Sequence, residues 1–256
     1  MRLNYKNGYY EGSVSYDEPN GYGTFYDYNG SKYVGYFING HIQTGKFYFK
    51  DGTVYEGPFD SNWDFHGKGK MTWKDGDTYT GEFRHGEKTG QGVFRWKKGG
   101  YLEGYFENFI IKKGKHVTSD GGKYEGTFDN DEKYHGKGKY YYTDGCIYDG
   151  DWLHGERTGR GVVWSTKNKY RYEGYFLNGD RHGHGKLRYS NEDDRVYEGE
   201  FKEGKMEGKF IITFDNGKKI ERYYEDDHIA DGILEEKNDN GETSYYYYKD
   251  GDFFGL

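Results

Sequence analysis

Histidines are the first candidates for chemistry, since nine occur in a chain of 256 residues and several recur at fixed spacings. His66, His135 and His182 each precede a Gly-x-Gly triplet, while His85 and His154 share a second position. Histidines of one row in successive copies would lie two strands apart, about 9 to 10 Å. Two imidazoles on one zinc ion need nitrogens about 2.0 to 2.1 Å from the metal. We therefore predict no metal site, and structural or hydrogen-bonding roles for these side chains.

Glycine-rich segments such as "GKGK" and "GHGK" resemble part of a phosphate-binding loop. A Walker motif places four residues between its first glycine and Gly-Lys-Ser/Thr, and a helix behind it directs amide groups at the phosphate. Neither feature is present here. We therefore predict no nucleotide and no other cofactor.

A row of carboxylates could suggest acid–base catalysis. It consists of Glu56, Glu103, Glu125, Glu173 and Glu198. A glycosidase uses one distinctive carboxylate pair some 5 to 10 Å apart, whereas periodic carboxylates more often pair with lysines on adjacent strands. The single Cys146 has no recurrent histidine partner that would mark a nucleophile. We predict no catalytic residue and no enzymatic activity.

These residues are carried by an internal repeat whose marker is the triplet Tyr-x-Gly. The triplet begins at Tyr10, Tyr33, Tyr55, Tyr79, Tyr124, Tyr148, Tyr172 and Tyr197, with a shifted copy at Leu102, so the step is 22 to 25 residues. Two degenerate copies follow near Ile220 and Ser244. We predict one repeat array over residues 1–256, clear in 9–217, with degenerate acidic repeats or a cap in 218–256.

Each repeat predicts two strands joined by tight turns. From Tyr172 the residues of one face alternate with those of the other, which is the period of a strand. Asn-Gly and Asp-Gly pairs lie within repeats, as at Asn178-Gly179, and between them, as at Asp144-Gly145. Such pairs supply the positive φ of two-residue hairpin turns. The predicted fold is all-β: an elongated, twisted and grooved single-layer antiparallel sheet of consecutive β-hairpins.

Rings gather on one face of this predicted sheet, together with the glycines. Second-strand positions such as Trp73, Phe94 and Trp96 share that face with the Tyr, Gly and Phe or Trp of each first strand. A glycine opposite a ring leaves a flat floor on which the ring can lie, the arrangement that lets a glycine persist inside a strand. We therefore interpret the glycines as making room for rings.

Composition restricts the class of protein. The chain has 43 glycines, 31 tyrosines and a single cysteine, so a disulfide-stapled secreted scaffold is excluded. Neither a signal peptide nor an apolar run of about 20 residues is evident. A net charge of -7 disfavours nucleic acid and anionic lipid. We predict a cytoplasmic protein, with the cytoskeleton and the membrane periphery left open as sites of action.

The repeat resembles a known family. Segments such as "YEGPFDSNWDFHGKGK", "YEGTFDNDEKYHGKGK" and "YEGYFLNGDRHGHGKL" are similar to MORN repeats, the membrane occupation and recognition nexus family. The resemblance implies an array of hairpins that acts as a scaffold or targeting module, binds peptides or helices in its groove, or dimerises, with phosphoinositide recognition as a further reported role. The repeat from Leu102 departs from the pattern because it lacks His-Gly-x-Gly.

An aromatic face without a second layer is a candidate binding surface. We predict a non-enzymatic scaffold or adaptor that binds a peptide or an amphipathic helix along an aromatic groove. The alternative is a peripheral membrane module that binds phosphoinositides. The predicted groove residues are Tyr55, Phe59, Trp73, Tyr79, Phe83, Trp96, Tyr124, Phe128, Tyr142, Tyr148, Trp152, Tyr172, Phe176, Tyr189, Tyr197 and Phe201.

The C-terminal end adds two expectations. Eleven acidic residues stand against three basic ones between Glu221 and Asp252, which would favour a basic peptide and repel anionic lipid. The end also carries "SYYYYKDG" (residues 244–251), whose strand-forming residues we expect at an unpaired edge of the sheet. Such an edge predicts homodimerisation as one use of this end.

Overall fold

The fold consists of strands alone in the part of the chain that the structure describes. A computed structural model describes residues 1–190, 194–230, 232–237, 243–249 and 252–255, and these contain no helix. It divides the chain into two compact units, Met1–Glu132 and Lys133–Leu256. Among the described residues, no helix is long and apolar enough to pass through a bilayer.

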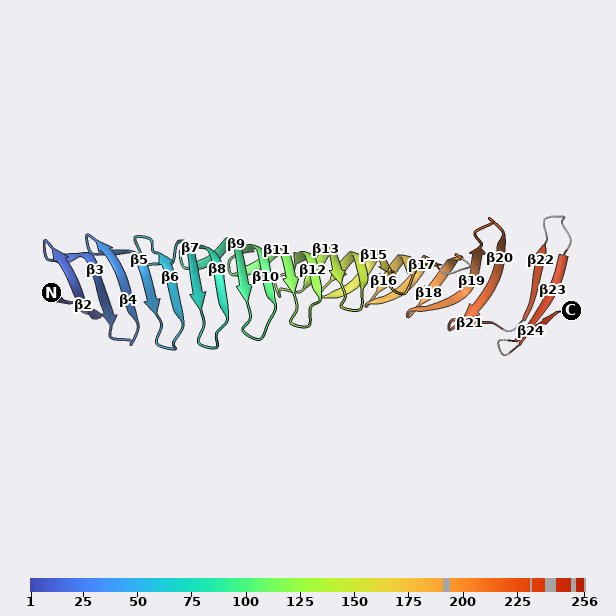
Figure 1. The fold of residues 1–256 in the computed structure, drawn as a ribbon, viewed down its shortest axis with the longest axis horizontal. Helices are drawn as coiled ribbons and strands as arrows, with labels where there is room; N and C mark the ends of the chain where they lie inside the picture. Colours follow the sequence, from blue (N-terminus) through green and yellow to red (C-terminus); the bar gives the residue numbers. More distant parts are fainter. Residues whose placement is uncertain (191–193, 231, 238–242, 250–251, 256) are drawn as a thin grey trace. The chain divides into compact units, whose positions relative to one another are not determined.

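The N-terminal unit is one sheet of antiparallel strands that pair in chain order, as the blue-to-green part of Figure 1 shows. Its strands are β1 (Arg2–Asn4), β2 (Gly8–Ser15), β3 (Glu18–Asp27), β4 (Lys32–Ile38), β5 (His41–Tyr48), β6 (Val54–Pro58), β7 (Gly67–Thr72), β8 (Thr78–Arg84), β9 (Glu87–Arg95), β10 (Tyr101–Glu107), β11 (Ile110–Val117) and β12 (Lys123–Phe128).

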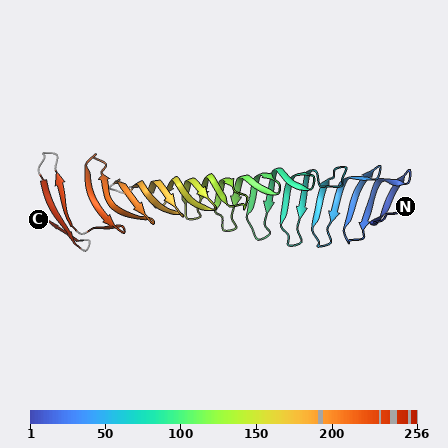
Figure 2. The same cartoon turned by 180° about the vertical axis from the view of Figure 1, so that it is seen from behind.

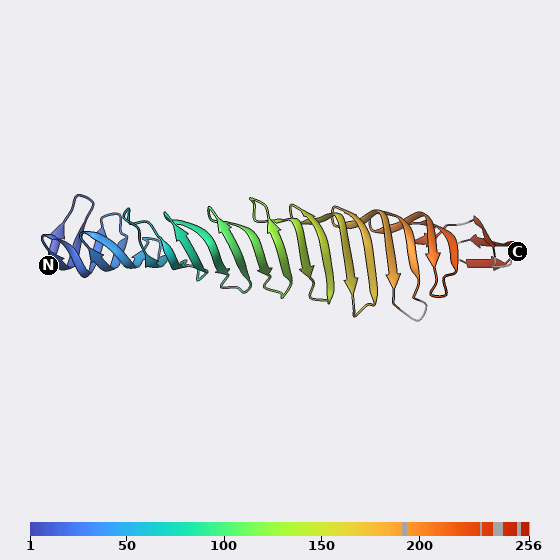
Figure 3. The same cartoon turned by 90° about the horizontal axis from the view of Figure 1, so that it is seen from above.

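The C-terminal unit repeats this arrangement and adds a small sheet. Strands β13 to β21 pair in chain order, and β22 to β24 form a separate three-stranded sheet (Figures 2 and 3). The strands are β13 (Tyr134–Tyr141), β14 (Cys146–Leu153), β15 (Glu156–Ser165), β16 (Tyr170–Leu177), β17 (Asp180–Tyr189), β18 (Val196–Lys202), β19 (Lys205–Thr213), β20 (Lys219–Glu225), β21 (His228–Ile229), β22 (Gly232–Lys237), β23 (Thr243–Lys249) and β24 (Asp252–Gly255). The predicted all-β array of consecutive hairpins is confirmed.

A row of glycines crosses each sheet because paired strands place a glycine opposite a glycine. In the N-terminal unit Gly69 pairs with Gly81, Gly81 with Gly92, and Gly92 with Gly104. In the C-terminal unit the row runs through Gly138, Gly150, Gly161, Gly174, Gly185 and Gly199. The register of the strands thus follows from one position per strand.

In at least five repeats the tyrosine lies on this glycine row. A Cβ atom added to Gly81 would meet the Tyr79 hydroxyl at 2.5 Å, and one added to Gly92 would meet it at 2.3 Å. Tyr10, Tyr55, Tyr148 and Tyr172 lie on their own glycine pairs in the same way. Tyr79 is 0% exposed, although its sheet has one layer. The interpretation that the glycines make room for rings is confirmed.

Four buried tyrosines, Tyr10, Tyr79, Tyr148 and Tyr172, also donate to a carbonyl near a β-bulge. The pairing of β8 with β9 shifts between Gly81 and Glu82, and the Tyr79 hydroxyl donates to the Glu82 carbonyl at 3.3 Å. Tyr148 donates to the carbonyl of Asp151 at 2.9 Å beside an equivalent shift. Because a bulge interrupts the ladder, a hydroxyl that reaches this carbonyl limits the cost of burying it.

Edge-to-face ring pairs connect consecutive repeats. The Tyr79 ring lies 5.3 Å from Phe83 of its own repeat and 5.2 Å from Phe106 of the next. Tyr172 makes the same two contacts, at 5.3 Å with Phe176 and 5.0 Å with Phe201. Such pairs contribute about 0.5 to 1.5 kcal/mol each beyond area burial. The apolar core of each sheet is therefore a line of rings.

The turns are of two kinds, and this corrects part of the sequence interpretation. Within repeats, Asn39 (φ 48°) and Gly40 (φ 79°) are both left-handed, as predicted for a two-residue hairpin turn. In the turns between repeats only the glycine has a left-handed φ, as with Gly52 (φ 97°) after Asp51. Phe49 there accepts from Gly52 at 3.1 Å and donates to Thr53 at 2.9 Å. The two-residue prediction is wrong for these turns, which have the three-residue loop of a type I turn with a glycine bulge.

The prediction of an unpaired edge at residues 244–251 is also wrong for its described part. Strand β23 pairs with β22 on one side and with β24 on the other, so it is the central strand of its sheet. Asp250 and Gly251, like Asp231, Asp239 and Glu242 of the acidic end, lie outside the described residues.

Filling the glycine row should destabilise the fold. Gly81→Ala places a Cβ atom 2.5 Å from the Tyr79 hydroxyl and 2.6 Å from the Gly92 Cα atom. We expect the free energy of unfolding to fall by about 2 kcal/mol, as overpacking does, measured by urea denaturation. Lys74→Ala, at an exposed position of the turn that precedes β8, is the control and should change stability by less than about 0.5 kcal/mol. Equal effects of the two variants would contradict this role of the glycine row.

Alkaline pH should unfold the protein through its buried tyrosines. Burial raises the pKa of Tyr55, Tyr79 and Tyr172 to about 12, from 10.0 in the unfolded chain. Between pH 10 and 12 the unfolded chain releases protons that the folded chain retains, so stability falls as the pH rises. Denaturation midpoints at pH 9, 10, 11 and 12 measure this fall. Replacing the three tyrosines by phenylalanine should reduce the slope relative to Tyr16→Phe, which alters a 97% exposed side chain; an unchanged slope would contradict the assignment.

Candidate partner-binding surface

The two faces of each sheet have different characters. The face that carries the buried tyrosines, called here the ring face, is apolar, and the opposite face, the polar face, carries the carboxylate row. On the polar face Lys46 lies opposite Glu56 at 3.3 Å, and Lys186 lies opposite Glu198 at 3.1 Å. The predicted pairing of the row with lysines on adjacent strands is confirmed for these two pairs. Both are exposed ion pairs and contribute little stability.

Most of the predicted groove residues lie inside the sheet packing. Eleven of the sixteen are buried: Tyr55, Phe59, Tyr79, Phe83, Tyr124, Phe128, Tyr148, Trp152, Tyr172, Phe176 and Phe201. Trp152 also donates its indole N–H to the Gly138 carbonyl at 3.0 Å. These side chains form the apolar core of the sheets, and their rings do not face solvent, so they are not available to contact a partner.

The other five predicted residues keep part of their rings in solvent. Trp73, Trp96, Tyr142 and Tyr197 are half-buried, and Tyr189 is 41% exposed. In the C-terminal unit a hollow of about 350 Å³ on the ring face is lined by Tyr170, Phe176, Arg181 and Tyr189, among others. Contact with a partner stays a prediction for these five residues.

A continuous group of half-exposed rings lies on the ring face of the N-terminal unit. We call Trp73, Phe94, Trp96 and His116 the ring stripe. Successive rings are 5.2 Å apart from Trp73 to Phe94, 5.2 Å from Phe94 to Trp96 and 5.4 Å from Trp96 to His116. The register places Phe94 opposite Tyr79, so the stripe continues the buried core toward the ends of the strands.

A lysine beneath the ring stripe was missed by the sequence interpretation. The Lys88 ammonium lies 5.4 Å from the ring centroids of Tyr79 and Phe94 and 5.7 Å from that of Trp73. Desolvation by burial lowers its pKa. The register sets Lys88 opposite Phe83. In other repeats the residue opposite the corresponding aromatic side chain is an isoleucine with 0% exposure (Ile42 and Ile111) or an arginine (Arg157 and Arg181). The sequence did contain a signal for this lysine: Lys88 follows the hairpin turn at His85-Gly86 by two residues, at a position of the ring face where an apolar residue is expected.

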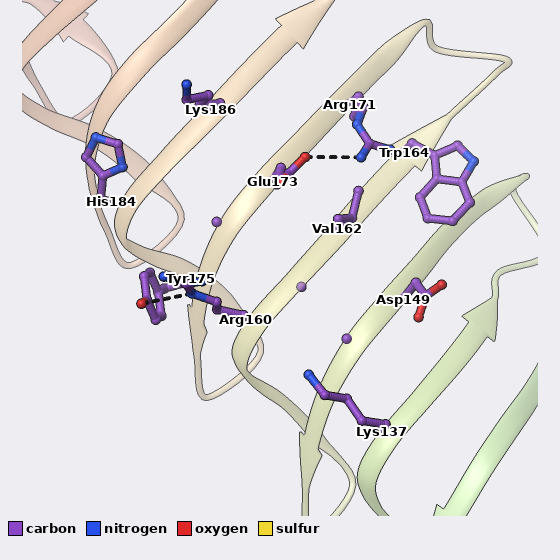
Figure 4. A pocket seen from close by; sticks show the side chains of 13 residues that line it. Lys137, Asp149, Arg160, Val162, Trp164, Arg171, Glu173, Tyr175, His184 and Lys186 are labelled. Atoms are coloured by element: carbon purple, nitrogen blue, oxygen red, sulfur yellow. Dashed lines mark hydrogen bonds and ion pairs between the residues drawn. The ribbon is translucent and has the colours of Figure 1, made fainter.

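The polar face has hollows of its own, which the sequence interpretation also missed. In the C-terminal unit a trough of about 620 Å³ has Gly150, Gly161 and Gly174 among its lining residues (Figure 4). Arg160 donates to the Tyr175 hydroxyl at 3.0 Å and Arg171 to Glu173 at 3.1 Å at its sides. Because glycines have no side chain, the glycine row leaves space on the polar face as well as on the ring face, and this space on the polar face is the trough. Arg160 and Arg171 at the sides of the trough are already hydrogen-bonded within the protein.

Comparison with known families identifies the repeat. The family model described as MORN repeat matches residues 10–32, 63–78, 79–101, 124–147, 148–169, 172–193 and 197–219, more than half of the chain. Residues 33–62 and 102–123 lie outside the match, yet they contain all but the first residue of β4 and β10 and the whole of β5, β6 and β11, which pair in the same chain order.

Curated relatives are much longer than this chain. Alsin of Rattus norvegicus and Alsin of Homo sapiens are each 29% identical over 214 residues, which covers 69% of this chain and 13% of Alsin. Alsin of Mus musculus is 28% identical over 140 residues. The chain therefore spans about an eighth of the length of the first two relatives.

Solved structures show a distant likeness. The wild-type TCP10 domain of Danio rerio CPAP is 14% identical with a TM-score of 0.42, covering 86% of this chain and 97% of that domain. The Drosophila SAS-4 TCP domain, solved with a proline-rich motif of Ana2, is 11% identical with a TM-score of 0.34, covering 78% of this chain and 88% of that domain. Similarity at this level does not identify a shared partner.

Removing the half-buried, partly desolvated charge at Lys88 should stabilise the fold. Lys88→Ile installs the residue found at the equivalent Ile42 and Ile111. We expect the free energy of unfolding to rise by about 1 kcal/mol, because replacing a buried ion with an apolar side chain is often stabilising. Lys68→Ile, at an exposed position of β7, should change stability by less than about 0.5 kcal/mol. A loss of stability in Lys88→Ile would show that the ring contacts outweigh desolvation.

Proposed function

The chain belongs to the MORN repeat family, and from this premise we propose that it is a non-enzymatic scaffold that binds a protein segment along the ring stripe of its N-terminal unit. The segment is an extended peptide or an amphipathic helix that places apolar side chains on Trp73, Phe94 and Trp96. Aromatic side chains are enriched among the residues that dominate binding energy.

The observation that carries the proposal is the unequal burial of the rings. Six repeats bury the tyrosine of their Tyr-x-Gly triplet completely, as with Tyr79 at 0% exposure beside Phe83 at 2%, whereas Trp73 and Trp96 stay half-exposed. All described strands of this unit belong to one sheet, so no second layer of the unit covers the stripe. A contiguous group of partly exposed rings on one face of a sheet is the kind of surface that partners bind.

Lys88 gives the proposed segment a chemical character. Its ammonium lies among the rings of the stripe and has lost part of its hydration. A carboxylate on the partner would restore the lost interaction in a site of low dielectric, where charge pairs are stronger than in water. For this surface we therefore propose an apolar segment with an acidic residue, in contrast to the basic peptide expected from the acidic C-terminal end.

Trimming the two tryptophans should weaken capture of the partner. We expect Trp73→Ala with Trp96→Ala to reduce affinity by about 700-fold if the two effects add, and by at least about 30-fold, the effect of a single residue that contributes about 2 kcal/mol. Partners are identified by crosslinking the purified chain in an extract, and the crosslinked segment is then synthesised and titrated by calorimetry.

The control is an aromatic-to-alanine substitution on the polar face, where the proposed segment does not bind. Tyr175→Ala removes a 42% exposed ring there and should leave affinity within about twofold. Trp152→Ala is unsuitable because that side chain is buried. An unchanged affinity in the double variant, or flotation with phosphoinositide vesicles in place of peptide binding, would overturn the proposal.

A further inference from the structure

Three metal-ligating side chains meet at one end of the N-terminal sheet. Asp60 follows β6, His66 precedes β7 and His85 follows β8. One ligand atom from each residue lies within 4.8 Å of the ligand atoms of the other two, and His85 Nδ1 is 2.8 Å from Asp60 Oδ2. The His66 and His85 rings are 5.8 Å apart.

The prediction of no metal site considered histidines only within one row of the repeat. His66 belongs to the row before Gly-x-Gly, whereas His85 occupies a hairpin turn of the following repeat, with a left-handed φ of 49°. A backbone hydrogen bond from Gly86 to the Phe65 carbonyl, at 2.9 Å, holds this turn beside the residue that precedes His66. Consecutive repeats therefore bring the two rows together where copies within one row stay apart.

Asp60 is oriented before any ion arrives. Its Oδ1 atom accepts from the backbone amides of Asn62 at 2.9 Å and Asp64 at 3.1 Å. The other oxygen, Oδ2, is thereby directed at His85. The Asp60 side chain is 13% exposed and the His85 side chain 62% exposed. Fixing a ligating carboxylate through hydrogen bonds to its second oxygen is a common device around bound metals.

The size of the neighbouring hollow and the charges that line it affect which ion Asp60, His66 and His85 can bind. A hollow of about 800 Å³ is lined by both histidines, Glu82 and Tyr105, and so leaves room for a further ligand or water. Arg84 and Lys68 also line this hollow and oppose a cation, whereas Glu82 in its lining favours one, as does Asp60 beside His85. Imidazole and carboxylate together are ligands that suit zinc.

We propose that Asp60, His66 and His85 bind a zinc ion with three protein ligands and one open position. Tetrahedral coordination at 2.0 to 2.1 Å places ligand atoms about 3.4 Å from one another. The 2.8 Å contact between His85 and Asp60 must therefore open slightly, and the His66 ring, whose ligand atom lies within 4.8 Å of the other two, must rotate toward them. His85 already directs Nδ1 at Asp60, and His66 is exposed, so its ring can turn toward them. The ion links two consecutive repeats through a turn and a strand end.

The sequence contains the same pattern a second time. Six positions separate Asp60 from His66 and nineteen separate His66 from His85, and the same steps connect Asp129, His135 and His154. For the test, His135→Gln and His154→Gln are therefore introduced together as a background, so that zinc bound by the first set is measured alone.

Calorimetric titration of zinc chloride into the tag-free full chain tests the proposal. In the His135→Gln, His154→Gln background we expect one zinc ion per chain, and a tetrahedral absorption spectrum with cobalt(II) in its place. His85→Gln and Asp60→Asn should each weaken zinc binding at least tenfold, whereas His184→Gln, an exposed histidine of the other unit, should not.

Circular dichroism of each variant separates loss of a ligand from loss of fold. Asp60→Asn keeps an oxygen for the Asn62 and Asp64 amides and should remain folded. The proposal is overturned if no stoichiometric zinc binds, or if affinity is unchanged by His66→Gln and His85→Gln together. It is also overturned if the cobalt spectrum is octahedral, since that geometry indicates water ligands in place of the three side chains.

Discussion

The contact of a tyrosine ring with two glycines on paired strands is the constraint on which the rest of the structure depends. A one-layer sheet has no opposite layer against which to bury side chains. The ring of Tyr79 solves this by lying flat across Gly81 and Gly92, and its hydroxyl reaches the Glu82 carbonyl beside the bulge. Register, burial and hydrogen bonding are therefore fixed together in the repeats that carry this contact, which are those of Tyr10, Tyr55, Tyr79, Tyr148 and Tyr172.

The residues that define the repeat are buried in this packing, so other positions of the repeat are left to form the binding surface. Tyr79 and Phe83 are fully used in the packing, so they cannot also present rings to a partner. What varies between repeats lies around them: the half-exposed Trp73 and Trp96, and the position that holds Lys88 in one repeat and Ile111 in the next. A constant core thus supports a variable surface.

Stacking of repeats also brings together residues that are distant in sequence. The Lys88 ammonium lies among rings of three strands or their ends, and the turn at His85 lies beside Asp60 of the preceding repeat. Each of these groups depends on the contact between one repeat and the next. They are properties of the array, and a single repeat does not contain them.

The sequence by itself determined the fold class, the face on which the rings lie and the purpose of the glycines, because a period of two, turn residues and a repeat of 22 to 25 residues are all local signals. It did not separate the buried Tyr148 from the half-exposed Trp73, since both alternate onto one face. Tertiary structure decided that difference, the three-residue turns such as that at Asp51-Gly52 and the meeting of His66 with His85. Burial and side-chain distance depend on how the strands of neighbouring repeats lie against one another, and a linear pattern of residue types does not record that.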